Sequence, residues 1–197
     1  MRKLIQSLKA YLIFSVVLGL VYPLFVTFIA KFFMPYKANG SLMIKGDQIV
    51  GSELVGQSFT KPWYFQSRPS ACGYDASRSG ATNFGPSSKK LMDNVAGKIA
   101  RTRKENGLGP MARIPGDMVQ CSSSGLDPHI SKKNALIQFK RVAILRKMPE
   151  NVLVKLIDEN TDPDFIGIWG RQGVNILKLN LALDAVAVSK QQNKIRN

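Results

Sequence analysis

Two segments of the chain combine the residue types that catalytic and ligand-binding sites use. The first, residues 80–89, reads Gly-Ala-Thr-Asn-Phe-Gly-Pro-Ser-Ser-Lys and places two glycines ahead of an expected helix. Backbone N–H groups of such a loop can surround a phosphate. A phosphate-binding loop needs lysine directly after its second glycine, but Pro86 stands there and removes a backbone donor. No apolar strand precedes the loop, so we interpret it as the capped start of a helix.

The second segment, residues 121–131, contains serines, Asp127 and His129, which is the only histidine of the chain. Serine, aspartate and histidine together could form a hydrolase triad, but triads are assembled from separated segments. Residues 125–128, Gly-Leu-Asp-Pro, are typical of a turn that leads into a helix. A Gly-x-Ser-x-Gly nucleophile motif is also absent from the sequence. The sequence therefore predicts a non-catalytic protein, with no catalytic residue and no cofactor bound directly.

The cysteines, like these two segments, do not indicate a catalytic or metal-binding site. Cys72 and Cys121 are the two cysteines, and with one histidine they do not supply a zinc site, so we predict no metal ligand. An oxidising compartment would permit a disulfide between them. Their separation in the sequence leaves open whether they pair.

The elements that must position these segments are those of a mixed α+β domain. Short apolar runs at 42–44 and 49–50 predict two strands joined by a turn at Gly46-Asp47. Residues 61–86 read as a long ordered loop. A helix is expected over 87–106, with Ser87 as its cap, an apolar stripe of Leu91, Val95 and Ile99, and Gly107 as its end.

The second half of the domain is expected to begin with a short strand at 118–120. A helix capped by Ser131 follows over 131–147, with Leu136, Phe139, Ala143 and Arg146 on successive turns. Pro149 ends that helix and opens a third, which runs to about residue 160. Leucines alternate with polar residues over 174–183, which predicts a half-buried strand.

An apolar segment near the N-terminus determines where this domain resides. Residues 10–30 carry no charge, and as a helix they would span roughly 31 Å, enough to cross the hydrocarbon core of a membrane. A cleaved signal peptide is the alternative, but the run is long and Phe28-Ile29-Ala30 lacks a second small residue before the cut. We predict a retained transmembrane helix at 10–32. A basic flank at 1–9 in the cytoplasm, an extracytoplasmic α+β domain at 33–187 and a disordered tail at 188–197 complete the organisation.

The predicted span has one face that could pack on another helix. Ser15, Gly19 and Pro23 recur at i, i+4 and i+8, and small residues at this spacing allow close helix–helix approach in membranes. Pro23 should also kink the helix. The alternative is that membrane helices simply tolerate glycine and proline.

The chain is strongly basic, with 28 lysines and arginines against 13 acidic residues. Such a surplus could attract nucleic acid, an anionic membrane surface or an acidic protein. The densest run, residues 98–104, ends an expected helix, where cations complement the helix dipole. A domain outside the cytoplasm without a nucleic-acid-binding motif does not fit a nucleic-acid partner, so we predict none.

Several motifs of the chain also resemble one family. The chain is similar to the C subunit of the Kdp P-type potassium-transporting ATPase, the KdpC family, in motifs that follow one another in order. These are Tyr22-Pro23, the segments at 38–42, 51–60, 64–65, 68–71 and 122–127, and the run from Val174-Asn175 to Asp184. Ala81-Thr82 departs from the family pattern, and the two cysteines are not among its hallmarks.

The resemblance implies a non-catalytic accessory subunit of a high-affinity potassium uptake pump in the bacterial inner membrane. It implies three partners: a channel-like potassium-binding subunit, a P-type ATPase subunit and a small single-span subunit. ATP and potassium then belong to those partners. One implied role is stabilising their assembly as an extracytoplasmic cap. The alternative is a catalytic chaperone that raises the ATP affinity of the ATPase subunit through a shared nucleotide contact.

The predicted orientation favours the cap, because ATP is cytoplasmic and only the short basic flank lies on that side. Two further hypotheses about the function predict different behaviour. A membrane-tethered enzyme would be active as a soluble fragment, and a free-standing tethered binder of envelope polymers would purify alone.

Overall fold

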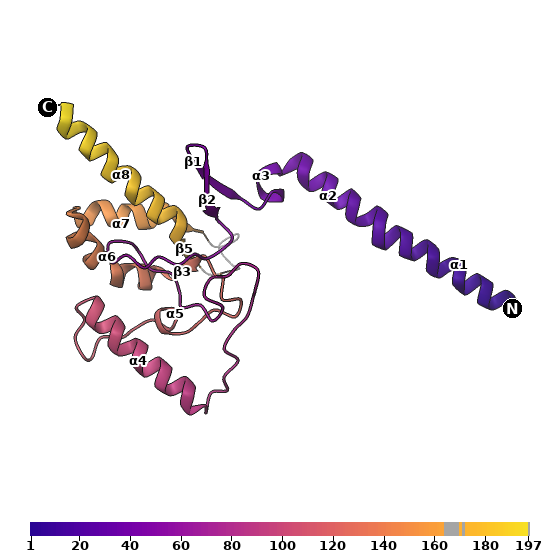
Figure 1. Ribbon diagram of the computed structural model, residues 1–197, viewed down its shortest axis with the longest axis horizontal. Coiled ribbons are helices and arrows are strands. Elements are labelled where there is room, and N and C mark those ends of the chain that lie inside the picture. The colour runs from indigo at the N-terminus through magenta and orange to yellow at the C-terminus, as the bar shows by residue number, and fades with distance from the viewer. Residues whose placement is uncertain (164–169, 171, 197) are drawn as a thin grey trace. The chain divides into compact units, whose positions relative to one another are not determined.

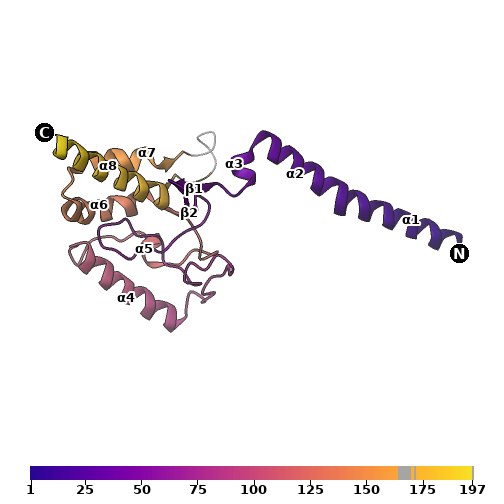
Figure 2. The same ribbon diagram turned by 45° about the horizontal axis from the view of Figure 1, so that its top comes forward.

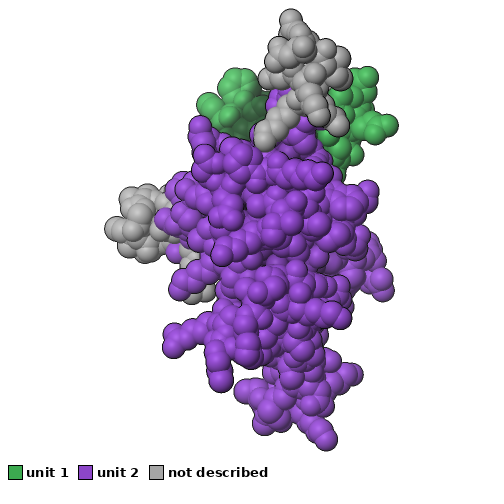
Figure 3. All heavy atoms as spheres, turned by 90° about the vertical axis from the view of Figure 1, so that its left-hand side faces the viewer, with its two compact units in different colours: residues 1–50 green, residues 51–197 purple. Residues whose placement is uncertain are grey.

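The computed structural model describes residues 1–163, 170 and 172–196 of the chain, with side chains described up to Ser189. The chain forms two compact units, Met1–Val50 and Gly51–Asn197, shown in different colours in Figure 3. Helices and strands occur together, as the predicted α+β class requires. Each unit is described by itself.

The first unit consists of a long helix and a small hairpin. The helix comprises α1 (Arg2–Val16), η1 (Val17–Val21) and α2 (Tyr22–Phe33) in unbroken succession. Over Arg2–Phe33 it is long and apolar enough to cross a membrane, and it buries none of its most apolar window within the protein. The uncharged segment of the sequence lies inside this helix.

A short helix, α3 (Pro35–Ala38), leads to the hairpin of β1 (Leu42–Lys45) and β2 (Gln48–Ser52). Gly46 opens the connecting turn with φ +62°, a left-handed conformation that costs glycine little. The predicted hairpin is therefore confirmed, including the position of its turn.

The second unit is built around three helices and a small sheet. Its helices α6 (Lys132–Arg146), α7 (Glu150–Glu159) and α8 (Ile176–Arg196) pack together (Figures 1 and 2). The sheet has the antiparallel order β3-β5-β4, with strands His129–Ile130, Gly173–Asn175 and Thr161–Asp162. The largest core side chains come from the helices, the sheet and, at Phe65, an irregular segment: Phe65, Ile130, Leu153, Ile157, Val174, Ile176, Leu179 and Leu183.

A fourth long helix, α4 (Lys89–Glu105), lies on the other side of the irregular segments from α7 and α8 and contacts the short helix α5 (Gly116–Val119) (Figures 1 and 2). Ser88 caps α4 by accepting the N–H of Leu91, one residue later than the predicted Ser87. Gly107, at φ +62°, ends the helix as predicted. The stripe of Leu91, Val95 and Ile99 is only half-buried.

The predicted helix capped by Ser131 is confirmed, because the Ser131 hydroxyl accepts the N–H of Asn134. The predicted stripe on this helix is partly wrong. Leu136 is 38% exposed, and the buried positions are Asn134, Ala135, Gln138, Val142 and Ala143. Two of these are amides, which a pattern based on hydrophobicity cannot find. The third predicted helix is confirmed as α7, with Pro149 at its N-cap.

Two predicted strands are wrong. Residues 116–119 form α5, whose Asp117 faces the start of α6. Residues 176–183 belong to α8, and β5 keeps only the first two residues of the predicted strand, 174 and 175. Asn175 starts α8, because its side chain accepts the N–H of Lys178. This helix continues to Arg196, through most of the tail predicted to be disordered.

Candidate functional site

Buried amide side chains fix the path of the irregular segment 57–69, which forms one wall of a pocket. Asn180 on α8 pairs with both backbone polar groups of Phe65, and Gln138 on α6 does the same for Gln66. Both amides are nearly fully buried. In this way two helices hold an irregular segment through side chains, where a sheet would use a neighbouring strand.

A charged cluster holds the residues just before Phe65 in the same segment. Arg146 forms an ion pair with Asp184 at 2.7 Å and lies over the ring of Tyr64. The Tyr64 hydroxyl donates to Asp184 at 2.8 Å. Burial, followed by the contact with the Asp184 carboxylate, raises the pKa of Tyr64, and Arg146 opposes this shift. Arg141 adds bonds to the carbonyls of Pro62 and Tyr64.

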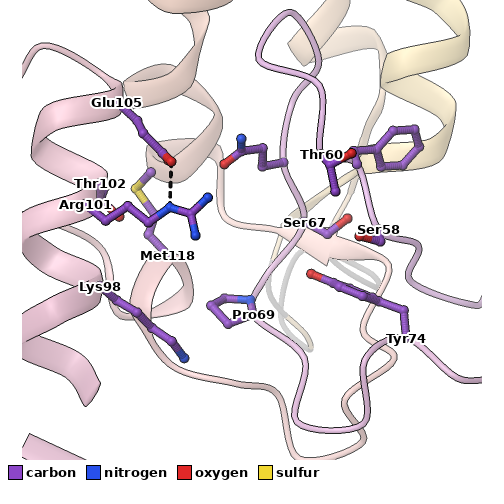
Figure 4. Close-up of a pocket in the computed structure, with 12 residues that line it drawn as sticks. Ser58, Thr60, Ser67, Pro69, Tyr74, Lys98, Arg101, Thr102, Glu105 and Met118 are labelled. Atoms are coloured by element: carbon purple, nitrogen blue, oxygen red, sulfur yellow. Dashed lines mark hydrogen bonds and ion pairs between the residues drawn. The ribbon is translucent and has the colours of Figure 1, made fainter. Parts of the chain in front are cut away.

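The pocket lies between this segment and α4 and has a volume of about 320 Å³. Figure 4 shows Lys98, Arg101 and Thr102 on α4 facing residues of the segment, among them Ser58 and Thr60. These α4 residues lie at i, i+3 and i+4, so they share one face of the helix. Glu105, one turn further, accepts a bond from Arg101 Nε at 2.6 Å.

Tyr74 also lines this pocket. Its hydroxyl donates to the carbonyl of Arg68 at 2.5 Å. Burial raises the pKa of Tyr74, and the two cysteines add to that shift. The sequence left open whether the two cysteines pair, and in the structure both thiols are free. Cys121 Sγ lies 3.8 Å from Lys98 Nζ, and Cys72 Sγ lies 3.6 Å from the carbonyl of Gly125.

A second, open groove of about 790 Å³ contains the residues that suggested a hydrolase triad. His129 Nε2 lies 2.8 Å from Asp162 Oδ2, and its Nδ1 lies 3.9 Å from Asp127 Oδ1. Asp127 also pairs with Arg68 at 2.8 Å. Both imidazole nitrogens thus face carboxylates, in place of the contact with a serine hydroxyl that a triad requires.

The glycine-containing loop at 80–89 forms contacts with neighbouring parts of the domain. Gly80 donates its N–H to the carbonyl of Ser124 at 2.9 Å. Lys90 lies over the ring of Phe84 at 5.3 Å. Since Ser88 already caps α4, the loop behaves as the capped helix start that the sequence predicts.

The predicted helix-packing residues fall in three consecutive pieces of the long helix: Ser15 in α1, Gly19 in η1 and Pro23 in α2. In η1 the turn is a π-turn, closed by the N–H of Tyr22 bonding to the carbonyl of Val17. This turn lies directly before Pro23, whose ring would otherwise press on the carbonyl four residues earlier. Widened turns of this kind often mark functional positions in helices.

The wide turn also changes which residues share a face. A turn closed by bonds from i to i+5 holds more residues than an α-turn, so a step of four residues comes closer to one full turn. Ser15, Gly19 and Pro23 are therefore better aligned than in a straight α-helix. All three are exposed within the unit, and a Cβ added at Gly19 would have no atom within 4 Å.

Comparison with known proteins matches both the helix and the domain. A family described as the c chain of the K+-transporting ATPase, KdpC, matches residues 4–185. Three relatives carry the name potassium-transporting ATPase KdpC subunit. The protein of Caldanaerobacter subterraneus is 47% identical over 178 residues, covering 90% of this chain and 92% of its own length.

The relative from Beijerinckia indica is 48% identical over 176 residues, covering 88% of this chain and 89% of its own length. That from Mycobacterium tuberculosis is 43% identical over 185 residues, covering 93% and 98%. The matched region includes nearly all of the apolar helix, the helices that carry the buried amides, and the pocket between segment 57–69 and α4. This chain belongs to the KdpC family of K+-transporting ATPase c chains.

Proposed function

We propose that this protein is a non-catalytic accessory subunit of an ATP-driven potassium uptake pump. In this role it stabilises the assembly of a channel-like subunit, a P-type ATPase subunit and a small single-span subunit. The observation that carries the proposal is the family match, which runs from residue 4 to residue 185 and so includes both the membrane-length helix and the domain.

The proposed location is the bacterial inner membrane, crossed once. Arg2, Lys3 and Lys9 precede the uncharged segment, and short basic flanks favour the cytoplasmic side. The domain then lies outside the cytoplasm, away from ATP. Nucleotide and potassium are handled by the partner subunits, and this chain acts through contacts with them.

The long helix supplies the proposed contact within the membrane. Ser15, Gly19 and Pro23 leave a face without bulky side chains, and the open space around Gly19 lets a neighbouring helix approach its backbone. Packing of this kind holds membrane helices together where lipid removes the hydrophobic driving force.

Co-purification tests the proposal. We expect an affinity-tagged chain to retain a P-type ATPase subunit in mild detergent, and the Gly19→Leu variant to lose most of it. Val21→Leu, which changes a neighbouring residue off the small-residue face, serves as the matched control and should retain the complex. Purification of the unmodified chain without any ATPase subunit would contradict membership in the pump. Intact assembly in Gly19→Leu would contradict only the helix contact.

A reporter fused after Asn197 tests the orientation. An extracytoplasmic signal supports the cap. A cytoplasmic signal would overturn it and favour the alternative role, in which this subunit shares a nucleotide contact with the ATPase subunit.

A further inference from the structure

The pocket between α4 and segment 57–69 contains a polar group that the rest of the domain does not use. Thr102 is only 8% exposed, yet its hydroxyl has no hydrogen-bond partner among the residues that the structure describes. The oxygen of this hydroxyl stays accessible from the pocket, so a ligand there can form the hydrogen bond that the protein does not supply (Figure 4).

The surrounding side chains define what that group must be. Lys98 and Arg101 come from the same face of α4 as Thr102 and add ammonium and guanidinium donors. The Arg101 side chain is largely exposed and bonds to Glu105 through Nε at 2.6 Å, which leaves its two Nη groups available. Across the pocket, Ser58 and Thr60 are exposed, and their hydroxyls form no hydrogen bond to the described part of the chain, so they can turn toward a ligand.

The charge and shape of the pocket limit the ligand further. Lys98, Arg101 and Glu105 together carry one positive charge, so a singly charged anion neutralises the site and a dianion does not. Donors on two facing walls suit the tetrahedral oxygens of a phosphate group better than a planar carboxylate. Phe59, Pro69 and Met118 supply apolar surface for the carbon atoms next to such a group. The volume of about 320 Å³ is at the lower end of the range for small-molecule sites.

We infer that this pocket binds a singly charged phosphodiester, of the kind found in the headgroup of phosphatidylglycerol and in free glycerophosphodiesters. Thr102, Lys98 and Arg101 donate to its oxygens from α4, and Ser58 and Thr60 donate from the opposite wall. The headgroup source rests on the proposed membrane anchor, from which residues 34–50 can extend by at most about 60 Å to the domain. This inference adds a ligand to the domain and does not depend on its role in assembly.

The test uses the full chain in maltoside micelles, which contain no phosphate, titrated with glycerophosphoglycerol by isothermal calorimetry. We expect saturable one-site binding. Thr102→Val, which replaces the hydroxyl with a methyl group, should weaken it about tenfold or more, because a hydrogen bond to a charged group is lost. Thr102→Ser keeps the hydroxyl and should bind as the unmodified chain does.

A charge control distinguishes binding in the pocket from a general attraction between the basic domain and an anion. Lys98→Gln should weaken binding about tenfold, whereas Lys104→Gln removes the same charge from an exposed position of α4 outside the pocket and should leave binding unchanged. Thermal unfolding of each variant serves to check that the variant remains folded. Equal loss in Lys98→Gln and Lys104→Gln, or no binding by the unmodified chain, would overturn the inference.

Nanodiscs containing phosphatidylglycerol identify the source of the ligand. If headgroups fill the pocket, moving the unmodified chain from micelles into these discs should weaken its apparent affinity for glycerophosphoglycerol severalfold. Equal affinity in micelles and discs would support the pocket as a site for the soluble diester. Thr102→Val should still co-purify with the ATPase subunit, so failure of the pocket and failure of the assembly role give different results.

Discussion

The side chain of Asn180 pairs with both backbone polar groups of Phe65: Oδ1 accepts the N–H at 3.0 Å, and Nδ2 donates to the carbonyl at 2.9 Å. Asn180 is 2% exposed and Phe65 is fully buried, so water cannot replace either bond. The two residues are far apart in the sequence, and their contact fixes α8 against the segment that forms the pocket wall.

Asn180→Leu, which keeps the size of the side chain, should destabilise the protein by about 3 kcal/mol, because it leaves two buried backbone groups unpaired. Denaturant unfolding of the full chain in detergent micelles, followed by fluorescence, measures the change. Asn94→Leu at an exposed position of α4 is the control, expected within about 0.5 kcal/mol of the unmodified protein. A similar small effect for Asn180→Leu would show that the bidentate contact is dispensable.

Gly56 lies where two backbones touch. A Cβ added there would come within 2.5 Å of the carbonyl oxygen of Asp127, and the N–H of Gly56 bonds to the carbonyl of Leu126 at 2.7 Å. Gly56→Ala should therefore lower the free energy of unfolding by about 2 kcal/mol, since neither backbone can move without breaking the bond. Gly109→Ala, which adds its Cβ to open space, should change it by less than about 0.5 kcal/mol. Equal stability of the two variants would contradict the close approach.

Asp117 joins α5 to the start of α6. Its carboxylate accepts bonds from the N–H and hydroxyl of Ser131 and from the amide of Asn134, at distances of 2.7 to 3.1 Å. Asp117→Ala should cost about 2 kcal/mol, because three donors at a helix start lose their acceptor. Asp93→Ala, at an exposed position of α4, removes an acidic residue without such bonds. Urea unfolding should distinguish the two variants. Equal unfolding midpoints would contradict a stabilising role for the bonds of Asp117.

Tyr64 should make the protein sensitive to alkali. Its pKa is raised above the ordinary 10.0, so the folded state holds this proton more tightly than the unfolded state. The corresponding stability is fully present below pH 10.0 and is lost as the pH rises through the folded-state pKa. We expect Tyr64→Phe to lose less stability than the unmodified protein between about pH 9 and pH 11, in thermal unfolding at each pH. Identical losses would show that Tyr64 does not contribute.

Elements with local signals could be predicted from the sequence. The hairpin, the cap at Ser131 and the end of α4 at Gly107 each depend on a few neighbouring residues, and all three are present. The run at 174–183 shows the limit of this reasoning. Its leucines alternate as in a strand, but Ile176, Leu179 and Leu183 also recur at helical spacing, and the cap at Asn175 decides between the two.

The pocket could not be predicted, because its walls come from segments far apart in the sequence. Residues 98–104 were interpreted only as the basic end of a helix. The spacing of Lys98, Arg101 and Thr102 does place them on one face, which was the available signal. Nothing local indicates that buried amides on α6 and α8 hold segment 57–69 opposite that face.

The π-turn at Val17–Val21 has a consequence for any scan along the long helix. One extra residue in a turn offsets the two flanking pieces by about 100° relative to an uninterrupted helix. A single helical wheel drawn through Arg2–Phe33 would therefore assign wrong neighbours to one half. Tryptophan replacements along α1 and α2 should weaken assembly of the complex at regularly spaced positions in each piece. The positions in α2 should be displaced by one residue from those that the repeat in α1 predicts.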